Sequence, residues 1–275
     1  MEKLLTYSLS IFLFITAGCH QKQGIRFDHL SDEEKSAKLQ ELDSIKNYYY
    51  QGSRIKQALF DTLMVLDPLN ADYLQEKSVT HSKIGDYHVA IPLLEKAEEL
   101  NPSETLYYYS WLMTNLYKDY EKALIKLQKY DDLTPEEVDY AWGENVNFLK
   151  GKMHQQLKQY DQALQEYDYY ISSEGEENVD IYVFVYRGIT HMENGRYKDA
   201  LADFEKMLTL YDKSSMAYYY KGITHLQLAD TASALEALLH AKTLLEKGYK
   251  KTDPYKEVYN EVHLMQVEDK LAELD

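Results

Sequence analysis

Hydrophobic residues along this chain recur at the spacing of amphipathic helices, and the helical stretches come in pairs. In each later pair, the second stretch carries an alanine at the same offset from the first. These alanines are Ala90, Ala123, Ala163, Ala200 and Ala234, and successive ones are 33, 40, 37 and 34 residues apart. A period of about 34 residues that contains a helix, a turn and a helix is typical of a stacked helical array. The pattern therefore predicts an all-α fold.

Helix-breaking residues mark the boundaries of the repeats. Asp67-Pro68, Asn101-Pro102 and Thr134-Pro135 each lie between two pairs, and proline cannot continue a helix. Together with the alanine spacing, they predict units near residues 37–70, 71–103, 104–143, 144–180, 181–214 and 215–248. We expect these units to form a single domain, residues 31–275, that ends in a capping helix over residues 253–275.

The repeats resemble the tetratricopeptide repeat family. The family pattern has a bulky residue at position 4, a small one at 8, an aromatic one at 11, alanine at 20, and leucine or an aromatic residue at 24. The unit that starts at Ile181 matches it with Phe184, Gly188, His191, Ala200 and Phe204. The first unit departs from it, with Lys56 in place of the usual alanine. The resemblance implies a right-handed α-solenoid of helix-turn-helix repeats, in which the small residues let paired helices approach closely.

The N-terminal residues have the pattern of a secretory signal. An apolar run from Leu4 to Ala17 is shorter than the ~20 residues of a membrane-spanning helix and matches a signal core. It ends in Thr16-Ala17-Gly18-Cys19, which resembles the lipobox of bacterial lipoproteins. The resemblance implies a signal peptide over residues 1–18, acylation of Cys19 with fatty acids such as palmitate, and a tether over residues 19–30. We therefore expect a membrane-anchored lipoprotein of the cell envelope. His20 after the cysteine favours the outer membrane, facing the periplasm or the surface.

Composition and motifs narrow the classes of function. The chain has 275 residues and a formal net charge of −16, so it repels phosphate backbones, and we expect no nucleic acid partner. The sequence contains no G-x-S-x-G elbow, no H-E-x-x-H motif, no phosphate-binding loop and no paired cysteines with metal-ligand spacing. We therefore predict that the protein is not an enzyme and that it uses no cofactor and no metal.

Four histidines occupy position 11 of their repeats, namely His81, His154, His191 and His225. Such a series suggests a ladder of metal ligands. Helices of neighbouring units, however, lie about 8–10 Å apart, whereas two imidazoles on one zinc ion each need a Zn–N distance near ~2.1 Å. We therefore predict a packing role for these histidines.

The chain contains 27 tyrosines, and several fall where the resemblance implies a concave binding groove. In the tetratricopeptide repeat family, positions 2, 5, 9, 12 and 13 of the first helix line that groove. On this basis the predicted partner-binding residues are Tyr108, Leu112, Phe148, Lys152, Tyr182, Val185, Ile189, Met192, Tyr219 and Ile223. Aromatic residues and methionine are enriched where proteins bind partners. The alternative is that some of these rings pack between repeats.

These observations predict a lipid-anchored scaffold or adaptor that binds a protein or peptide partner of the envelope in a tyrosine-rich groove. A second hypothesis is a surface lipoprotein that binds carbohydrate, because aromatic rings stack on the faces of sugars. Calorimetry against a panel of glycans separates the two hypotheses.

Overall fold

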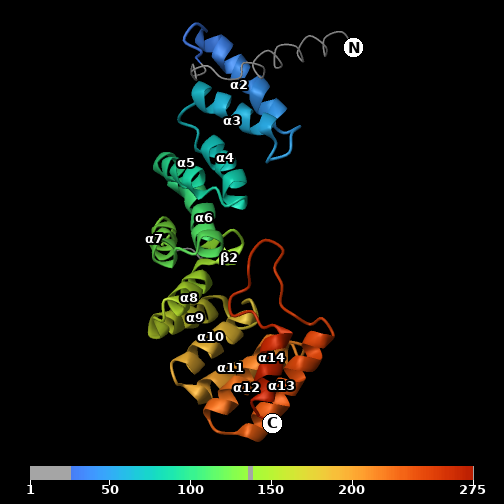
Figure 1. Cartoon of the computed structure of the whole chain (residues 1–275). Coiled ribbons are helices and arrows are strands. Elements are labelled where there is room, and N and C mark those ends of the chain that lie inside the picture. Colours follow the sequence, from blue (N-terminus) through green and yellow to red (C-terminus); the bar gives the residue numbers. More distant parts are fainter. Residues whose placement is uncertain (1–25, 136–138, 275) are drawn as a thin grey trace. The chain divides into compact units, whose positions relative to one another are not determined.

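The computed structural model describes residues 26–135 and 139–274 (Figure 1). The predicted signal peptide, Cys19 and most of the predicted tether lie outside these residues. The described residues form thirteen α-helices, one π-helix and a two-stranded β-hairpin. Within that part of the chain, no helix combines the length and the apolar character needed to cross a membrane. The predicted all-α fold is confirmed, with the short hairpin as an addition.

The helices follow one another as helix–turn–helix pairs. The pairs are α2 (Asp32–Lys46) with α3 (Arg54–Leu66), α4 (Ala71–Lys83) with α5 (Tyr87–Leu100), α6 (Pro102–Leu112) with α7 (Tyr120–Asp131), α8 (Val146–Gln156) with α9 (Tyr160–Glu174), α10 (Tyr182–Glu193) with α11 (Tyr197–Leu210), and α12 (Ser215–Gln227) with α13 (Thr231–Glu246). The π-helix η1 (Met113–Tyr117) continues α6, and α14 (Leu264–Ala272) comes last. Ser31 and Glu34 form a capping box that starts α2.

Contacts group the chain into two compact units, residues 1–73 and 74–275, and the single domain that the sequence predicts over residues 31–275 stays a prediction. In the described part of the first unit, α2 and α3 enclose a small core of Leu42, Leu59, Phe60, Leu63 and Tyr73. Lys56 stands where the repeats usually have alanine, and its Nζ lies 5.9 Å from the centroid of the Phe60 ring. Of the residues of α2, only Leu42 is buried. The first pair therefore has a small core of its own.

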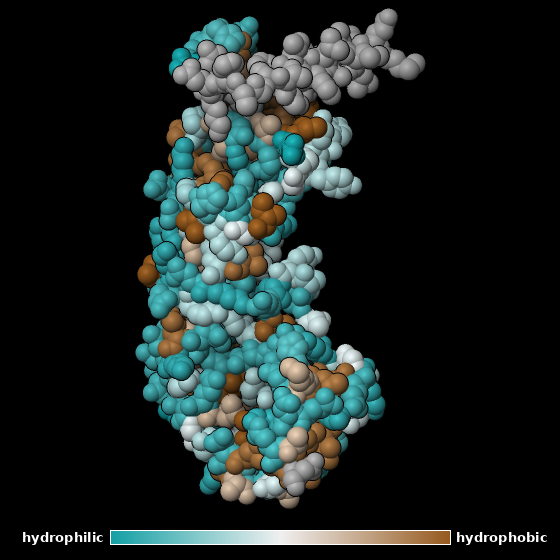
Figure 2. Space-filling view, viewed as in Figure 1, coloured by the Kyte–Doolittle hydropathy of each residue, from teal (hydrophilic) through white to brown (hydrophobic). Residues whose placement is uncertain are grey.

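In the second unit, glycine lets paired helices pack closely. A Cβ atom on Gly151 would lie 2.4 Å from the Tyr167 ring, and one on Gly188 would lie 2.7 Å from the Phe204 ring. Both rings are fully buried, so they have no free space into which to move. The small residue at position 8 is thus a steric requirement in these repeats. On the face in Figure 2, hydrophilic residues predominate and hydrophobic ones are scattered in small groups.

A β-hairpin lies within the longest interval between repeat alanines, that of 40 residues between Ala123 and Ala163. It pairs β1 (Tyr140–Ala141) with β2 (Glu144–Asn145) in antiparallel register. The two turn residues, Trp142 and Gly143, have φ angles of 51° and 82°. Positive φ at both positions is the signature of the tight hairpin turn whose twist matches that of its strands. The extra residues of this repeat thus build a feature that the helical pattern does not predict.

The segment between α13 and α14 is not helical. Residues 249–263, here called the strap, form neither helix nor strand, and they appear in Figure 1 as the red loop between α13 and α14. The predicted capping helix over residues 253–275 is therefore wrong for its first half, since α14 begins only at Leu264. Side chains of the strap contact helices far away in the sequence.

Candidate binding surface under the strap

The strap lies against the first helices of successive repeats. The Tyr259 hydroxyl donates to the carbonyl of Thr114 in η1, and the Lys256 ammonium pairs with Glu144 of β2. Further on, the Tyr220 hydroxyl of α12 donates to the carbonyl of Asn260, with an O–O distance of 3.1 Å. We call the surface that the strap contacts on η1, β2, α6, α8, α10 and α12 the inner face.

Tyr259 has the most enclosed seat on the inner face. Its side chain is 9% exposed, and its ring centroid lies 6.3 Å from that of Tyr120 and 5.9 Å from the Lys152 Nζ. Burial raises the pKa of the Tyr259 phenol, so the hydroxyl remains a donor. The acceptor carbonyl belongs to a π-helix, which ends where Lys118 adopts a left-handed φ of 54°. Such π-helical turns are frequent at functional sites.

Glu144 joins two lysines beneath the strap. Its Oε2 accepts from the Lys152 Nζ at 2.5 Å, and its Oε1 accepts from the Lys256 Nζ. The Lys152 side chain is almost fully buried, and its Nζ lies 4.4 Å from the centroid of the Phe148 ring. Burial lowers the pKa of both Lys152 and Lys256 to about 8, and at Lys152 the carboxylates of Asp180 and Asp253 partly oppose this shift. Lys256 also lies over the Trp111 ring, with 5.8 Å between its Nζ and the ring centroid.

An exposed aromatic platform lies beside this cluster. The Trp142 side chain at the hairpin turn is 53% exposed. Its ring centroid lies 5.9 Å from that of Tyr107, 5.1 Å from that of Tyr108 and 6.2 Å from that of Trp111. Sequence reasoning missed Trp142, which lies in the extra residues of the repeat, and Glu144, which begins the predicted unit 144–180 but is not a groove position of the family pattern. The signals that could have found them are the 40-residue interval and the Trp142-Gly143 turn.

The structure places the ten predicted partner-binding residues at different depths. Tyr108, Leu112, Phe148, Lys152, Val185 and Ile189 are buried, whereas Tyr182, Met192, Tyr219 and Ile223 are partly buried. Of these, Lys152 and Tyr182 contact the strap, since the Lys251 Nζ lies 3.4 Å from the centroid of the Tyr182 ring. Leu112, Val185 and Ile189 belong to the main hydrophobic core. Their role in partner binding stays a prediction. Their contacts in the structure are those of the alternative, in which these side chains pack between repeats.

Several buried polar side chains of the first helices have atoms that are not hydrogen-bonded. Thr114 Oγ1, Asn115 Oδ1 and Gln155 Oε1 have no hydrogen-bond partner among the described residues. Asn115 and Gln155 occupy the same position in consecutive repeats and are each 3% exposed. A buried polar atom without a partner is costly. A ligand whose polar groups reached these atoms would remove that cost.

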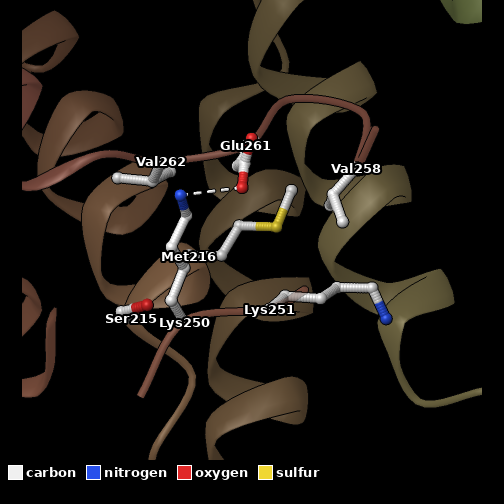
Figure 3. Close-up of a pocket in the computed structure, with 7 residues that line it drawn as sticks. All are labelled: Ser215, Met216, Lys250, Lys251, Val258, Glu261 and Val262. Atoms are coloured by element: carbon white, nitrogen blue, oxygen red, sulfur yellow. Dashed lines mark ion pairs between the residues drawn. The ribbon is translucent and has the colours of Figure 1, made fainter. Parts of the chain in front are cut away.

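The strap closes over the start of α12. Figure 3 shows Met216, which is 3% exposed, between the outgoing and returning arms of the strap. The recess there is lined by Ser215, Met216, Lys250, Lys251, Val258, Glu261 and Val262. Lys250 and Glu261 tie the two arms together through an ion pair of 2.8 Å. The recess encloses no space for a water molecule, so the strap fits closely at this end.

Three of the four histidines at position 11, His81, His154 and His225, contact the turns of their own repeats, whereas His191 lies beside Asp203 on α11. His81 Nδ1 lies 2.8 Å from an Asp86 carboxylate oxygen, and His154 Nδ1 lies 2.6 Å from the Gln159 side-chain oxygen. Each partner is five residues further on, in the turn before the second helix. Among the described residues, no three histidine, cysteine or carboxylate side chains are grouped to hold a metal ion. The contacts give His81, His154 and His225 a structural role in the turns.

Paired helices with small residues at their contact points define a tetratricopeptide repeat protein. Residues 71–104 match the tetratricopeptide repeat itself. Residues 104–270, which include the hairpin and the strap, match the family described as Iml2/Tetratricopeptide repeat protein 39, and the chain belongs to that family.

Known relatives support the same class. The TPR repeat-containing protein MJ1428 of Methanocaldococcus jannaschii is 27% identical over 188 residues, which are 62% of this chain and 32% of the relative, so the chain spans about a third of its length. The solved structure of MamA from Desulfovibrio magneticus RS-1 is 18% identical, with a TM-score of 0.55 over 64% of this chain and 96% of that one. YrrB, described as a TPR protein with an unusual peptide-binding site, is 19% identical, with a TM-score of 0.52 over 68% of this chain and 92% of its own. Both structures share the fold.

Proposed function

We propose that the protein is an interaction scaffold whose inner face binds an extended segment of a partner protein. Tetratricopeptide repeats bind proteins and peptides as a class. The observation that supports this use of the inner face is that a segment without helix or strand already lies on it, namely the strap. The similarity to YrrB, described as having a peptide-binding site, agrees with this proposal.

Trp142 gives the test of this proposal. A partner that takes the inner face of α6 and α8 would cover the exposed Trp142 ring, and aromatic anchors carry much of the binding energy at protein interfaces. We expect Trp142→Ala to lower capture of envelope partners by the full chain about tenfold or more, since truncated anchors often cost ~2 kcal/mol. The measurement is quantitative pull-down from solubilised envelopes.

Tyr169→Ala is the matched control for that experiment. Tyr169 is 58% exposed on α9, the second helix of its repeat, and so presents an aromatic ring away from the inner face. Its replacement should leave capture unchanged. Equal loss of capture in both variants, or no loss in either, would contradict binding at the inner face.

We also propose that the protein is anchored in the cell envelope by lipid on Cys19. The support is the sequence pattern at residues 4–19, which precedes the described residues. Intact mass should show an acylated N-terminal cysteine, and Cys19→Ala should move the protein from the membrane fraction to the soluble fraction. A Cys19→Ala chain that stays with the membrane would overturn the anchor and leave the binding proposal standing.

Carbohydrate remains the second candidate ligand, because the Trp142 ring is exposed and rests on other rings. Its stacked contact with Tyr107 has an interplanar angle of 15°. A rigid aromatic platform of this kind stacks well on a sugar face. Calorimetry against a glycan panel distinguishes carbohydrate from protein as the ligand. Glycan binding that Trp142→Ala abolishes would support carbohydrate binding, and no binding to any glycan would exclude it.

A further inference from the structure

We infer that the strap is an internal ligand of the inner face, and that the partner segment which replaces it carries a lysine and a tyrosine three positions apart. This inference rests on the proposed function, and it names the chemistry of the partner. In the strap these residues are Lys256 and Tyr259. An extended chain rises about 3.3 Å per residue, so three positions span roughly 10 Å. That is about the spacing of helices in neighbouring repeats.

Two adjoining repeats supply a seat for each of these side chains. The tyrosine seat combines the Thr114 carbonyl with the Tyr120 ring. The lysine seat combines the Glu144 carboxylate with the Trp111 ring. A hydroxyl donor on an aromatic ring and a cation on a long stem fulfil these two requirements. A peptide without both residues leaves one seat empty.

The strap is held in a way that permits release. Its backbone belongs to no helix or strand, and side chains make its main contacts with η1 and β2. At its tip Tyr255 is 77% exposed, and the Glu257 side chain, which pairs with Lys118, is also 77% exposed. Only Tyr259 and Val262 of the strap are buried in the main core, and segments with few buried side chains open at the low end of the stability range. The strap can therefore leave while the repeats stay folded.

Replacing the strap by a partner leaves the buried carboxylate of the inner face paired. When Lys256 leaves, Glu144 keeps its ion pair with Lys152, so no buried carboxylate is left without a partner. The rings of Trp111 and Tyr182 would instead lose their lysine contacts and face water. An uncovered aromatic surface favours a new occupant. The inner face is thus covered either by the strap or by a partner.

Unused hydrogen-bonding atoms give a partner an advantage over the strap. Because the strap is tethered at both ends, it competes at an effective concentration in the millimolar range. It leaves Thr114 Oγ1, Asn115 Oδ1 and Gln155 Oε1 without partners. A segment whose backbone reaches these three atoms makes contacts that the strap does not make. Such contacts allow an external ligand to displace a tethered one.

A synthetic peptide of residues 250–263 tests the inference on the full chain. Fluorescence anisotropy would compare its affinity for the wild-type chain, for Tyr259→Ala and for Tyr255→Ala. Tyr259→Ala removes the buried anchor of the strap, so we expect this chain to bind the peptide at least about tenfold more tightly than wild type. Tyr255→Ala alters the exposed tip of the same segment and should match wild type. Peptides that carry Lys256→Ala or Tyr259→Ala should bind at least about tenfold more weakly.

Equal affinity of the wild-type and Tyr259→Ala chains for the peptide would overturn the inference. If circular dichroism shows that the Tyr259→Ala chain is unfolded, hydrogen exchange of the wild-type chain tests the inference in its place. Excess isotope-labelled peptide should then speed exchange of amides 250–263 and leave α13 unchanged, and unchanged strap exchange would overturn the inference.

Partners captured equally by wild type and Tyr259→Ala would leave the proposed function intact and contradict displacement. Peptide exchange without any captured partner would support displacement and contradict the proposed function.

Discussion

Raising the pH above 10 is expected to unfold the protein cooperatively, because folding buries many phenols in their neutral form. Burial raises the pKa of Tyr117 to about 12, and it also raises the pKa of Tyr109, Tyr167, Tyr186 and Tyr259. In the unfolded chain these phenols return to a pKa of about 10. Their contribution to stability is therefore complete below pH 10 and is lost as the pH rises towards the folded values.

The free energy of unfolding is expected to fall steeply with pH above pH 10. Each such tyrosine lowers the free energy of unfolding by about 1.4 kcal/mol per pH unit once the unfolded chain ionises. Five of them give about 7 kcal/mol per unit, which is comparable with the whole stability of a typical domain, ~5–15 kcal/mol. Lys152 and Lys256 act in the opposite direction between pH 8 and about 10.4, but they are fewer. Circular dichroism and phenolate absorbance, recorded together, should change in one transition.

Single phenols can be removed to check this result. Tyr167→Phe deletes a hydroxyl from a fully buried ring and should make the alkaline transition shallower. Tyr169→Phe deletes one from an exposed ring two residues away and should leave the transition unchanged. Gradual phenolate formation near pH 10 with the helices intact would show that the tyrosines are not enclosed as described.

Arg187→Ala is expected to lower the free energy of unfolding by about 3–5 kcal/mol, the range for breaking a buried ion pair. Arg187 on α10 donates to both carboxylate oxygens of Asp203 on α11, from Nε at 2.9 Å and from Nη2 at 2.6 Å. Its Nη1 also donates to Asp168 on α9 at 2.7 Å. Asp203 is only 5% exposed, and its pKa is raised by burial although Arg187 opposes the shift. Without Arg187 a buried carboxylate loses its fixed cation. Urea denaturation measures the change.

Arg196→Ala is the control for this prediction. Arg196 pairs with Asp161 at 2.7 Å, but the two side chains are 48% and 70% exposed. Solvent screening limits such pairs to about 1 kcal/mol or less. Arg187→Lys keeps the charge but loses the two-pronged geometry, so it should fall between the other variants. A loss below about 1 kcal/mol for Arg187→Ala would contradict the role of this pair.

Much of the repeat architecture could be predicted from the sequence. Gly188 and Ala200 at their fixed positions predicted close helix pairing, and a Cβ on Gly188 would indeed meet the Phe204 ring at 2.7 Å. The family pattern also predicted Lys152, at position 9 of its repeat, as a groove residue, and Lys152 contacts the strap residue Tyr259. These features follow from local periodicity, because the contacts that they serve recur at the same spacing in each unit.

The candidate site could be predicted only in part. Residues 253–263 contain apolar positions with helical spacing, and this pattern placed Tyr259 on a capping helix. Instead, its hydroxyl donates a hydrogen bond to the carbonyl of Thr114, which is 145 residues away in the sequence. Glu144 was missed because it is the first residue of the predicted unit 144–180, which is not a groove position of the family pattern, whereas the structure places it in the hairpin. No local pattern encodes either contact.

The sequence alone determined the number and order of the later helix pairs, since residues close in the chain set amphipathic periodicity and helix ends. Only the tertiary structure decided that the last segment before α14 lies on the inner face, and that Trp142 and Glu144 border it. The physical reason is that contacts between distant residues, such as Lys256 with Glu144 and Tyr259 with Thr114, override the helical preference of the strap. Those contacts arise once the repeats have stacked.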